Sequence, residues 1–139
     1  AMIFSDLGIV TTTAENGPAL TRSLLTSLAS EGPDVIVLEL GDGLLGAYGV
    51  EAILSDAPIR AALTAVVLCA NDPVAAWGGA KILREQFGIE PAVVTGPATD
   101  NAVGIDQISE RLELPAINAL SNGVALGDHV FGVLRGEQK

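Results

Sequence analysis

Cysteine, histidine and basic residues are scarce in this sequence. Cys69 is the only cysteine, so no disulfide can form within the chain, and a reducing, cytoplasmic location is expected. Cys69 and the only histidine, His129, lie far apart in the sequence, which argues against a structural zinc site. The same scarcity leaves no set of nucleophile, base and orienting residue. Whether the chain is an enzyme therefore stays open.

Positive charge is also lacking. The chain has 7 basic and 17 acidic residues, which gives a net charge of −10. The basic residues are scattered along the sequence and form no cluster, whereas binding to a phosphate backbone needs a positive surface. Nucleic acid is therefore not an expected partner. The acidity is better explained as a means of keeping an apolar chain, 49% hydrophobic, in solution.

Long hydrophobic runs are missing as well. No segment approaches the roughly 18 to 20 apolar residues that a membrane-spanning helix needs. No basic segment is followed by an apolar stretch, so a signal peptide is not expected. A membrane is therefore not predicted as a partner.

Short apolar runs are present, and they predict strands. Val35–Leu40, Ala65–Ala70 and Ala92–Thr95 are almost continuously apolar, a pattern typical of strands buried on both faces of a parallel sheet. Ile3–Thr12 is a weaker first strand, and Pro115–Asn118 a very short fifth one.

Helical patterns lie between these runs. The predicted helices are Ala19–Ser30, Val50–Leu54 and Pro58–Leu63 as one broken helix or two short ones, Val74–Phe87, Val103–Leu112 and Val124–Leu134. Asp72 and Pro73 have the residue types of an N-cap and a first helical position, and Gly88 is a typical helix end. Either Asp100 or Asn101 can cap the helix that follows.

The alternation of strands and helices predicts an α/β fold. We expect a three-layer α/β/α domain over residues 1–139, with a mainly parallel sheet of about five strands, Rossmann-like or P-loop-like. The chain begins with Ala1 before Met2, and it is open whether it is the C-terminal domain of a longer protein.

In such sheets, ligands bind beyond the carboxyl ends of the strands. Glu39 stands one residue before the end of a predicted buried strand and precedes Gly41, Asp42 and Gly43. A buried carboxylate needs a cation, a metal or several donors, and glycines permit a ligand to come close. Glu39 is therefore a candidate to bind Mg²⁺ or orient a substrate. The alternative is a structural glutamate that accepts hydrogen bonds from neighbouring loop amides.

Two further loops follow predicted strands. The candidate ligand-binding residues in them are Asn71, Asp72, Thr95, Gly96, Thr99, Asp100 and Asn101. Loop amides and a helix N-terminus can hold an anion, although Asp100 would repel one. The alternative is that these side chains only cap helices.

The run Val35-Ile36-Val37-Leu38-Glu39-Leu40-Gly41-Asp42-Gly43-Leu44 resembles the later part of the dethiobiotin-synthetase-like P-loop NTPases, in which a strand closes with a Glu-Gly-x-Gly-Gly pattern. The resemblance implies that Glu39 is the carboxylate on the side of Mg²⁺ and substrate. Leu40 replaces the first glycine, and no Gly-x-x-x-x-Gly-Lys-[Ser/Thr] loop occurs in the chain. The resemblance thus implies Mg²⁺ and a nucleotide in a parent protein whose N-terminal domain would hold the phosphates.

The segment Gly41-x-Gly43-x-x-Gly46 also matches the letters of a dinucleotide-binding turn after a strand. An NAD-binding domain of an oxidoreductase is therefore one alternative. The favoured hypothesis is a ligand-binding domain of a larger protein that takes a nucleotide or small polar metabolite and is not catalytic alone. The other alternative is a non-catalytic scaffold or dimerisation domain, and homodimer formation stays open.

Overall fold

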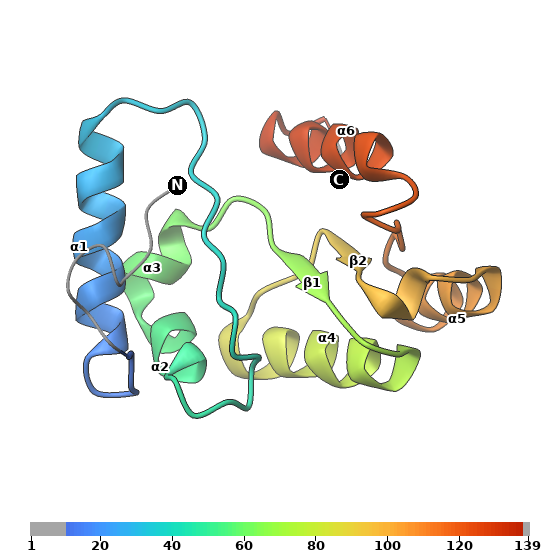
Figure 1. The fold of residues 1–139 in the computed structure, drawn as a ribbon, viewed down its shortest axis with the longest axis horizontal. Coiled ribbons are helices and arrows are strands. Elements are labelled where there is room, and N and C mark those ends of the chain that lie inside the picture. Colours follow the sequence, from blue (N-terminus) through green and yellow to red (C-terminus); the bar gives the residue numbers. More distant parts are fainter. Residues whose placement is uncertain (1–10, 138–139) are drawn as a thin grey trace. The chain divides into compact units, whose positions relative to one another are not determined.

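The computed structural model describes residues 11–137 (Figure 1). The chain divides into two compact units, Ala1–Ala62 (unit 1) and Leu63–Lys139 (unit 2), and each is described by itself. The helices and strands are α1 Gly17–Ser30, α2 Val50–Ser55, α3 Ala57–Ala62, β1 Val67–Cys69, α4 Pro73–Phe87, β2 Val93–Thr95, the 3₁₀ turn η2 Pro97–Thr99, α5 Ala102–Leu112 and α6 Gly123–Leu134.

The predicted sheet of about five strands is wrong. The chain is about 53% helical, and the described residues hold one parallel sheet of two strands, β1 and β2. Val67 pairs with Val93, and Cys69 with Thr95. The fifth predicted strand is reduced to a single parallel bridge between Val94 and Ala116.

The largest error concerns residues 35–40, which form no strand. Val37 is 89% exposed, and Glu39 is exposed too. No backbone hydrogen bond joins this segment to another described residue. A strand needs a neighbour with free N–H and C=O groups, and unit 1, as far as it is described, offers only helices and turns. Of the weaker first strand, residues 3–10 lie outside the described part, and Thr11 and Thr12 are not in a strand.

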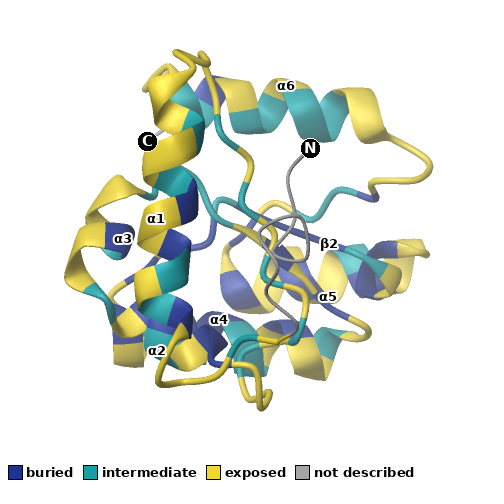
Figure 2. Cartoon of the chain, turned by 60° about the vertical axis from the view of Figure 1, so that its left-hand side comes forward, coloured by how far each residue is buried: buried dark blue, intermediate teal, exposed yellow. Residues whose placement is uncertain are grey.

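Unit 1 packs three helices around a small apolar core. Leu24 of α1, Ile53 and Leu54 of α2 and Ile59 of α3 are all at most 5% exposed. Gly17 lets α1 approach α2 closely, because a Cβ there would stand 3.2 Å from the Ile53 side chain. Arg22 of α1 forms an ion pair with Asp56, which precedes α3. Figure 2 shows the buried positions along α1 and α3.

Unit 2 is a β-α-β unit with two further helices. α4 connects β1 to β2 and packs against α5, and both lie on the side of the sheet opposite α6 (Figure 1). One stripe of α4, at helical spacing, is buried: Ala76, Ala80, Leu83 and Phe87. Ile108 of α5 and Val93 of β2 are also almost fully buried. The predicted helices, including two separate short ones at α2 and α3, are therefore confirmed.

Among the described helices, none has both the length and the apolar character needed to cross a membrane.

The predicted ends of α4 are confirmed. Asp72 is the N-cap, and its carboxylate accepts a hydrogen bond of 2.8 Å from the Ala75 N–H. Gly88 ends the helix in the left-handed conformation. Asn101, rather than Asp100, caps α5 by accepting from the Gly104 N–H at 3.0 Å.

Removal of the α4 cap should be measurable. We expect Asp72→Ala to lower the free energy of unfolding by about 1 kcal/mol, the typical loss when a capping side chain is deleted. Asp72→Asn, which keeps a capping oxygen, should lose less. Urea unfolding followed by the fluorescence of Trp77, the only tryptophan, measures both. Asp106→Ala is a matched control, since Asp106 is exposed within α5. Equal losses for Asp72→Ala and Asp106→Ala would contradict the capping role.

Candidate functional site

The polar residues that follow β1 and β2 meet at one edge of unit 2. The Ala98 N–H donates to the carbonyl oxygen of Ala70 at 3.0 Å, which ties the loop after β2 to the end of β1. Asn71 and Asp72 continue directly from Ala70 and are exposed. The structure thus brings together two of the loops that the sequence singled out. We call this group the edge cluster: Asn71, Asp72, Thr95, Gly96, Thr99, Asp100, Asn101, Asn118 and Ser121.

Gly96 makes the close approach of the loop possible. Its φ is +89°, a conformation that favours glycine, and a Cβ there would stand 2.8 Å from the Ala70 carbonyl oxygen. The glycine is therefore explained by the approach of one main chain to another.

Asn118 is the centre of the edge cluster. Its amide nitrogen donates to the Asp100 carboxylate at 2.9 Å and to the Thr99 hydroxyl at 3.3 Å. Its amide oxygen accepts from the N–H groups of Leu120 and Ser121, at 2.9 and 2.8 Å. Asn118 therefore ties the segment before α6 to the loop that leads into α5.

Two threonines complete the buried part of the edge cluster. The Thr95 hydroxyl oxygen accepts from the Ala119 N–H at 3.1 Å, and the Thr99 hydroxyl donates to the Gly96 carbonyl oxygen at 2.7 Å. Thr95, Thr99 and Asn118 are 4%, 1% and 8% exposed. They are the only buried polar residues in the described part of unit 2. Among the described residues of unit 2, buried polar side chains are thus found only in the edge cluster.

Sequence reasoning did not include Asn118 and Ser121 among the ligand-binding candidates. Asn118 follows the weakest predicted strand, so its position in the sheet could not be fixed from the pattern. The available signal was an asparagine at the end of a short extended run, where side-chain amides bond nearby backbone groups.

Two basic residues of unit 2, Lys81 and Arg84, are paired with acids outside the edge cluster. Arg84, near the end of α4, forms a two-pronged ion pair with Glu90 at 2.8 and 2.5 Å and also donates to the Leu112 carbonyl oxygen. The hydrogen bond to Glu90 raises the pKa of the Arg84 guanidinium. Lys81 pairs with Glu85 at 2.5 Å. The edge cluster itself contains the acids Asp72 and Asp100 and no base.

The loop that contains Glu39, Gly41, Asp42 and Gly43 belongs to unit 1 and differs from its prediction. The Asp42 carboxylate accepts a hydrogen bond of 2.8 Å from the Tyr48 N–H, so it is used within its own loop. A Cβ at Gly46 would stand 1.8 Å from that carboxylate, which explains this glycine without a ligand.

The predicted dinucleotide-binding turn and the predicted Mg²⁺ site at Glu39 both assumed that a strand precedes this loop. The structure has no strand there. A dinucleotide-binding turn joins a strand to a helix, whereas α2 begins only at Val50. The described residues contain no group of three or more His, Cys, Asp or Glu able to hold a metal ion. Glu39 thus offers a single exposed carboxylate to a metal or a substrate. Its role stays a prediction.

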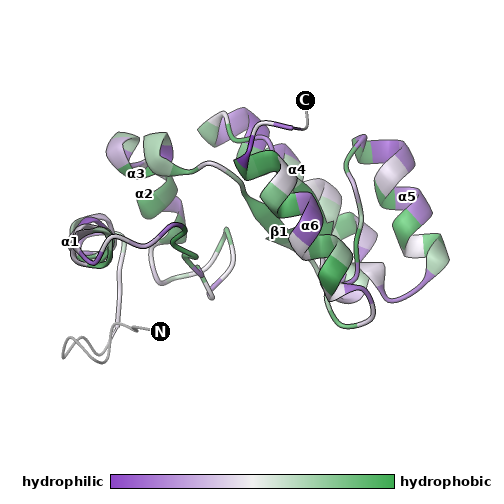
Figure 3. Cartoon of the chain, turned by 90° about the horizontal axis from the view of Figure 1, so that it is seen from above, coloured by the Kyte–Doolittle hydropathy of each residue, from purple (hydrophilic) through white to green (hydrophobic). Residues whose placement is uncertain are grey.

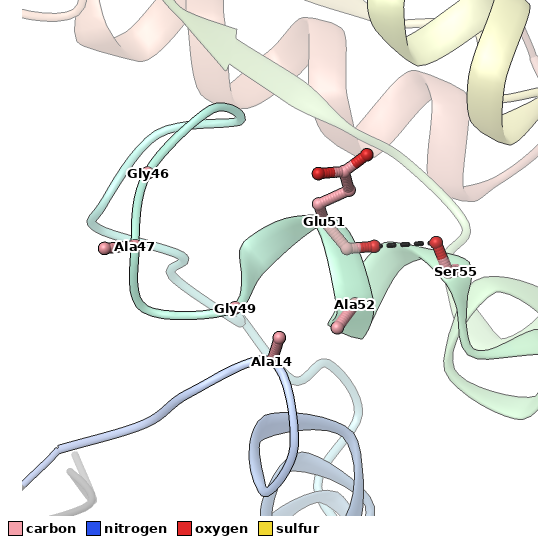
Figure 4. Close-up of a pocket in the computed structure, with 7 residues that line it drawn as sticks. All are labelled: Ala14, Gly46, Ala47, Gly49, Glu51, Ala52 and Ser55. Carbon is pink, nitrogen blue, oxygen red and sulfur yellow. Dashed lines mark hydrogen bonds between the residues drawn. The ribbon is translucent and has the colours of Figure 1, made fainter.

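Unit 1 also has an open cavity of about 320 Å³. It is lined by Ala14, Gly46, Ala47, Gly49, Glu51, Ala52 and Ser55 (Figure 4). The Ser55 hydroxyl donates to the main-chain carbonyl of Glu51 at 2.8 Å, and the other lining side chains are small. The cavity contains no predicted site residue and offers one carboxylate for chemistry, so it carries no functional argument.

Comparison with family models, with curated proteins and with solved structures finds no match to this chain. The resemblance to dethiobiotin-synthetase-like proteins therefore stays a prediction.

Proposed function

We propose that this chain is a ligand-binding part of a larger protein, and that unit 2 binds a small polar ligand, a nucleotide or metabolite, at the edge cluster. It does not catalyse a reaction alone. The observation that carries the proposal is the confinement of buried polar side chains in unit 2 to this edge. Burial of hydroxyl and amide groups costs free energy, and ligands of parallel sheets bind at carboxyl-terminal edges.

The charges at the edge limit the ligand. Asp72 and Asp100 would repel phosphate, and the Arg84 and Lys81 side chains are paired with acids elsewhere. A ligand that carries phosphate would therefore have to bring a divalent cation, whereas a neutral sugar or amide would not. Mg²⁺ dependence thus separates the two kinds of ligand.

A second candidate, a non-catalytic scaffold, is favoured by a specific observation. The side-chain oxygens of Thr95, Thr99 and Asn118 all have hydrogen-bond partners within the chain. These groups can hold the loops together without a ligand. The two hypotheses differ in whether Asp72 and Asp100, the exposed acids of the edge cluster, bind a ligand.

Thermal unfolding and calorimetry of the chain with ADP, ATP and NAD, each with and without Mg²⁺, test the proposal. We expect at least one of them to raise the melting temperature, because a ligand at about 100 times its Kd adds about 2.7 kcal/mol to the free energy of unfolding. Asp100→Asn should weaken the Mg²⁺-dependent binding about tenfold, because it removes a carboxylate that would contact the cation, and it should not weaken binding without Mg²⁺. Glu39→Gln should leave binding unchanged, because Glu39 is not part of the edge cluster.

Asp106→Asn, on the exposed surface of α5, is the matched control and should bind as the unaltered chain does. The scaffold is the better description if no ligand in this panel changes the melting temperature and Asp100→Asn alters stability alone.

A further inference from the structure

α6 has an exposed stripe that differs from the rest of the surface. Val124, Asp128, Phe131 and Arg135 recur at spacings of four, three and four residues, so they share one face of the helix. All four are exposed, Val124 at 80% and Phe131 at 51%. Phe131 is thus about half exposed and lies between an acid and a base on this face.

α6 contacts the rest of unit 2 beside this stripe. His129, which lies off the stripe, contacts the Ala92 carbonyl oxygen through Nε2 at 2.9 Å, and Gly132 is the one buried residue of α6. Most of the helix is hydrophobic (Figure 3). The four residues of the stripe itself remain exposed.

The charges on the stripe indicate which kind of partner can bind to it. The chain has a net charge of −10, but Asp128 and Arg135 cancel along the stripe. Asp128 lies three residues before Phe131, and Arg135 lies four residues after it. Two such helices that cross antiparallel at Phe131 place each Asp128 beside the Arg135 of the other copy. A parallel pair would place acid against acid.

We propose that α6 pairs with α6 of a second copy of the chain, in an antiparallel arrangement that crosses at Phe131. The two phenylalanine rings meet at the twofold axis, as aromatic pairs do in symmetric interfaces. Arg135 now pairs with Glu137 of its own chain at 2.7 Å, and in the dimer it would also contact Asp128 of the second copy. A single helix face is a small interface, so the dimer forms only at high protein concentration.

Sedimentation velocity of the full chain over a range of concentrations tests the pairing. The unaltered chain should shift from monomer to dimer as its concentration rises, and Phe131→Asp should remain monomeric. Val103→Asp is the matched control, because Val103 is 65% exposed on α5, and it should dimerise as the unaltered chain does. A monomer at every concentration, or equal loss of the dimer in both variants, would overturn the proposal.

A charge swap tests the register. In a Glu137→Gln background, which removes the partner of Arg135 within the chain, Asp128→Arg and Arg135→Asp should each raise the dimer Kd about tenfold or more, because each places like charges together. The double variant restores both pairs, and its Kd should return to within about threefold of that background. A double variant no better than either single one would exclude this antiparallel register.

Discussion

Asn118→Ala is expected to lower the free energy of unfolding of unit 2 by about 3 kcal/mol. The side chain is 8% exposed and holds the N–H groups of Leu120 and Ser121 as well as the Asp100 carboxylate. Alanine removes these hydrogen bonds, each of which contributes about 0.5–1.5 kcal/mol net to stability. Asp100, Leu120 and Ser121 are exposed, so water can replace the lost partner, and the expected sum stays at about 3 kcal/mol.

Urea unfolding monitored by Trp77 fluorescence measures this loss, because Trp77 lies in unit 2. Asn122→Ala is the matched control. Asn122 is at the N-cap of α6, is exposed and makes no side-chain capping hydrogen bond, so its loss should be below about 0.5 kcal/mol, as for ordinary surface positions. Similar losses for the two variants would show that the Asn118 network contributes little.

Gly49→Ala should have an effect of similar size in unit 1. Gly49 has a φ of +86°, and a Cβ there would stand 2.4 Å from the Thr13 carbonyl oxygen and 2.8 Å from the Ala14 nitrogen. The left-handed conformation alone costs a non-glycine residue about 1–2 kcal/mol. Because the obstructing atoms are main chain, the loop must also move, and we expect a total of about 3 kcal/mol or more.

Hydrogen exchange of the α2 amides, followed by mass spectrometry, measures this loss of stability. Gly43→Ala separates the two causes, since Gly43 has a φ of +79° with open space around it. It should show the conformational cost alone, about 1–2 kcal/mol. If Gly49→Ala lowers the free energy of unfolding no more than Gly43→Ala does, the close approach to Thr13 does not contribute to the loss.

The helices of this protein could be predicted from the sequence because their signals are local. The stripe that includes Ala80 and Leu83 follows the helical period, and Asp72, Gly88 and Asn101 act on backbone groups within four residues of themselves. Residues 35–40 show why the sheet could not be predicted. Their apolar run satisfies every local criterion for a strand, but a strand also needs a partner that no local pattern specifies.

The candidate site, too, could be predicted only in part from the sequence. Thr95, Thr99 and Asp100 could be predicted because they lie at or just after the end of a true strand, and the structure places them together. Glu39 was selected because it seemed buried, and it is exposed. Asn118 was passed over because its importance depends on contacts with residues about twenty positions earlier, which spacing along the chain does not reveal.

The segment Val35–Leu40, which makes no main-chain hydrogen bond to another described residue, has a consequence for handling the protein. Short apolar segments of high β-propensity that are not paired in a sheet are the material from which cross-β fibrils nucleate. Asp34 lies just before the segment and Glu39 one residue before its end, and their charges oppose such stacking. Acidification toward the isoelectric point of about 4.2 removes the net negative charge of the chain as a whole. Precipitation at mildly acid pH would then begin with intact chains and would not require them to unfold.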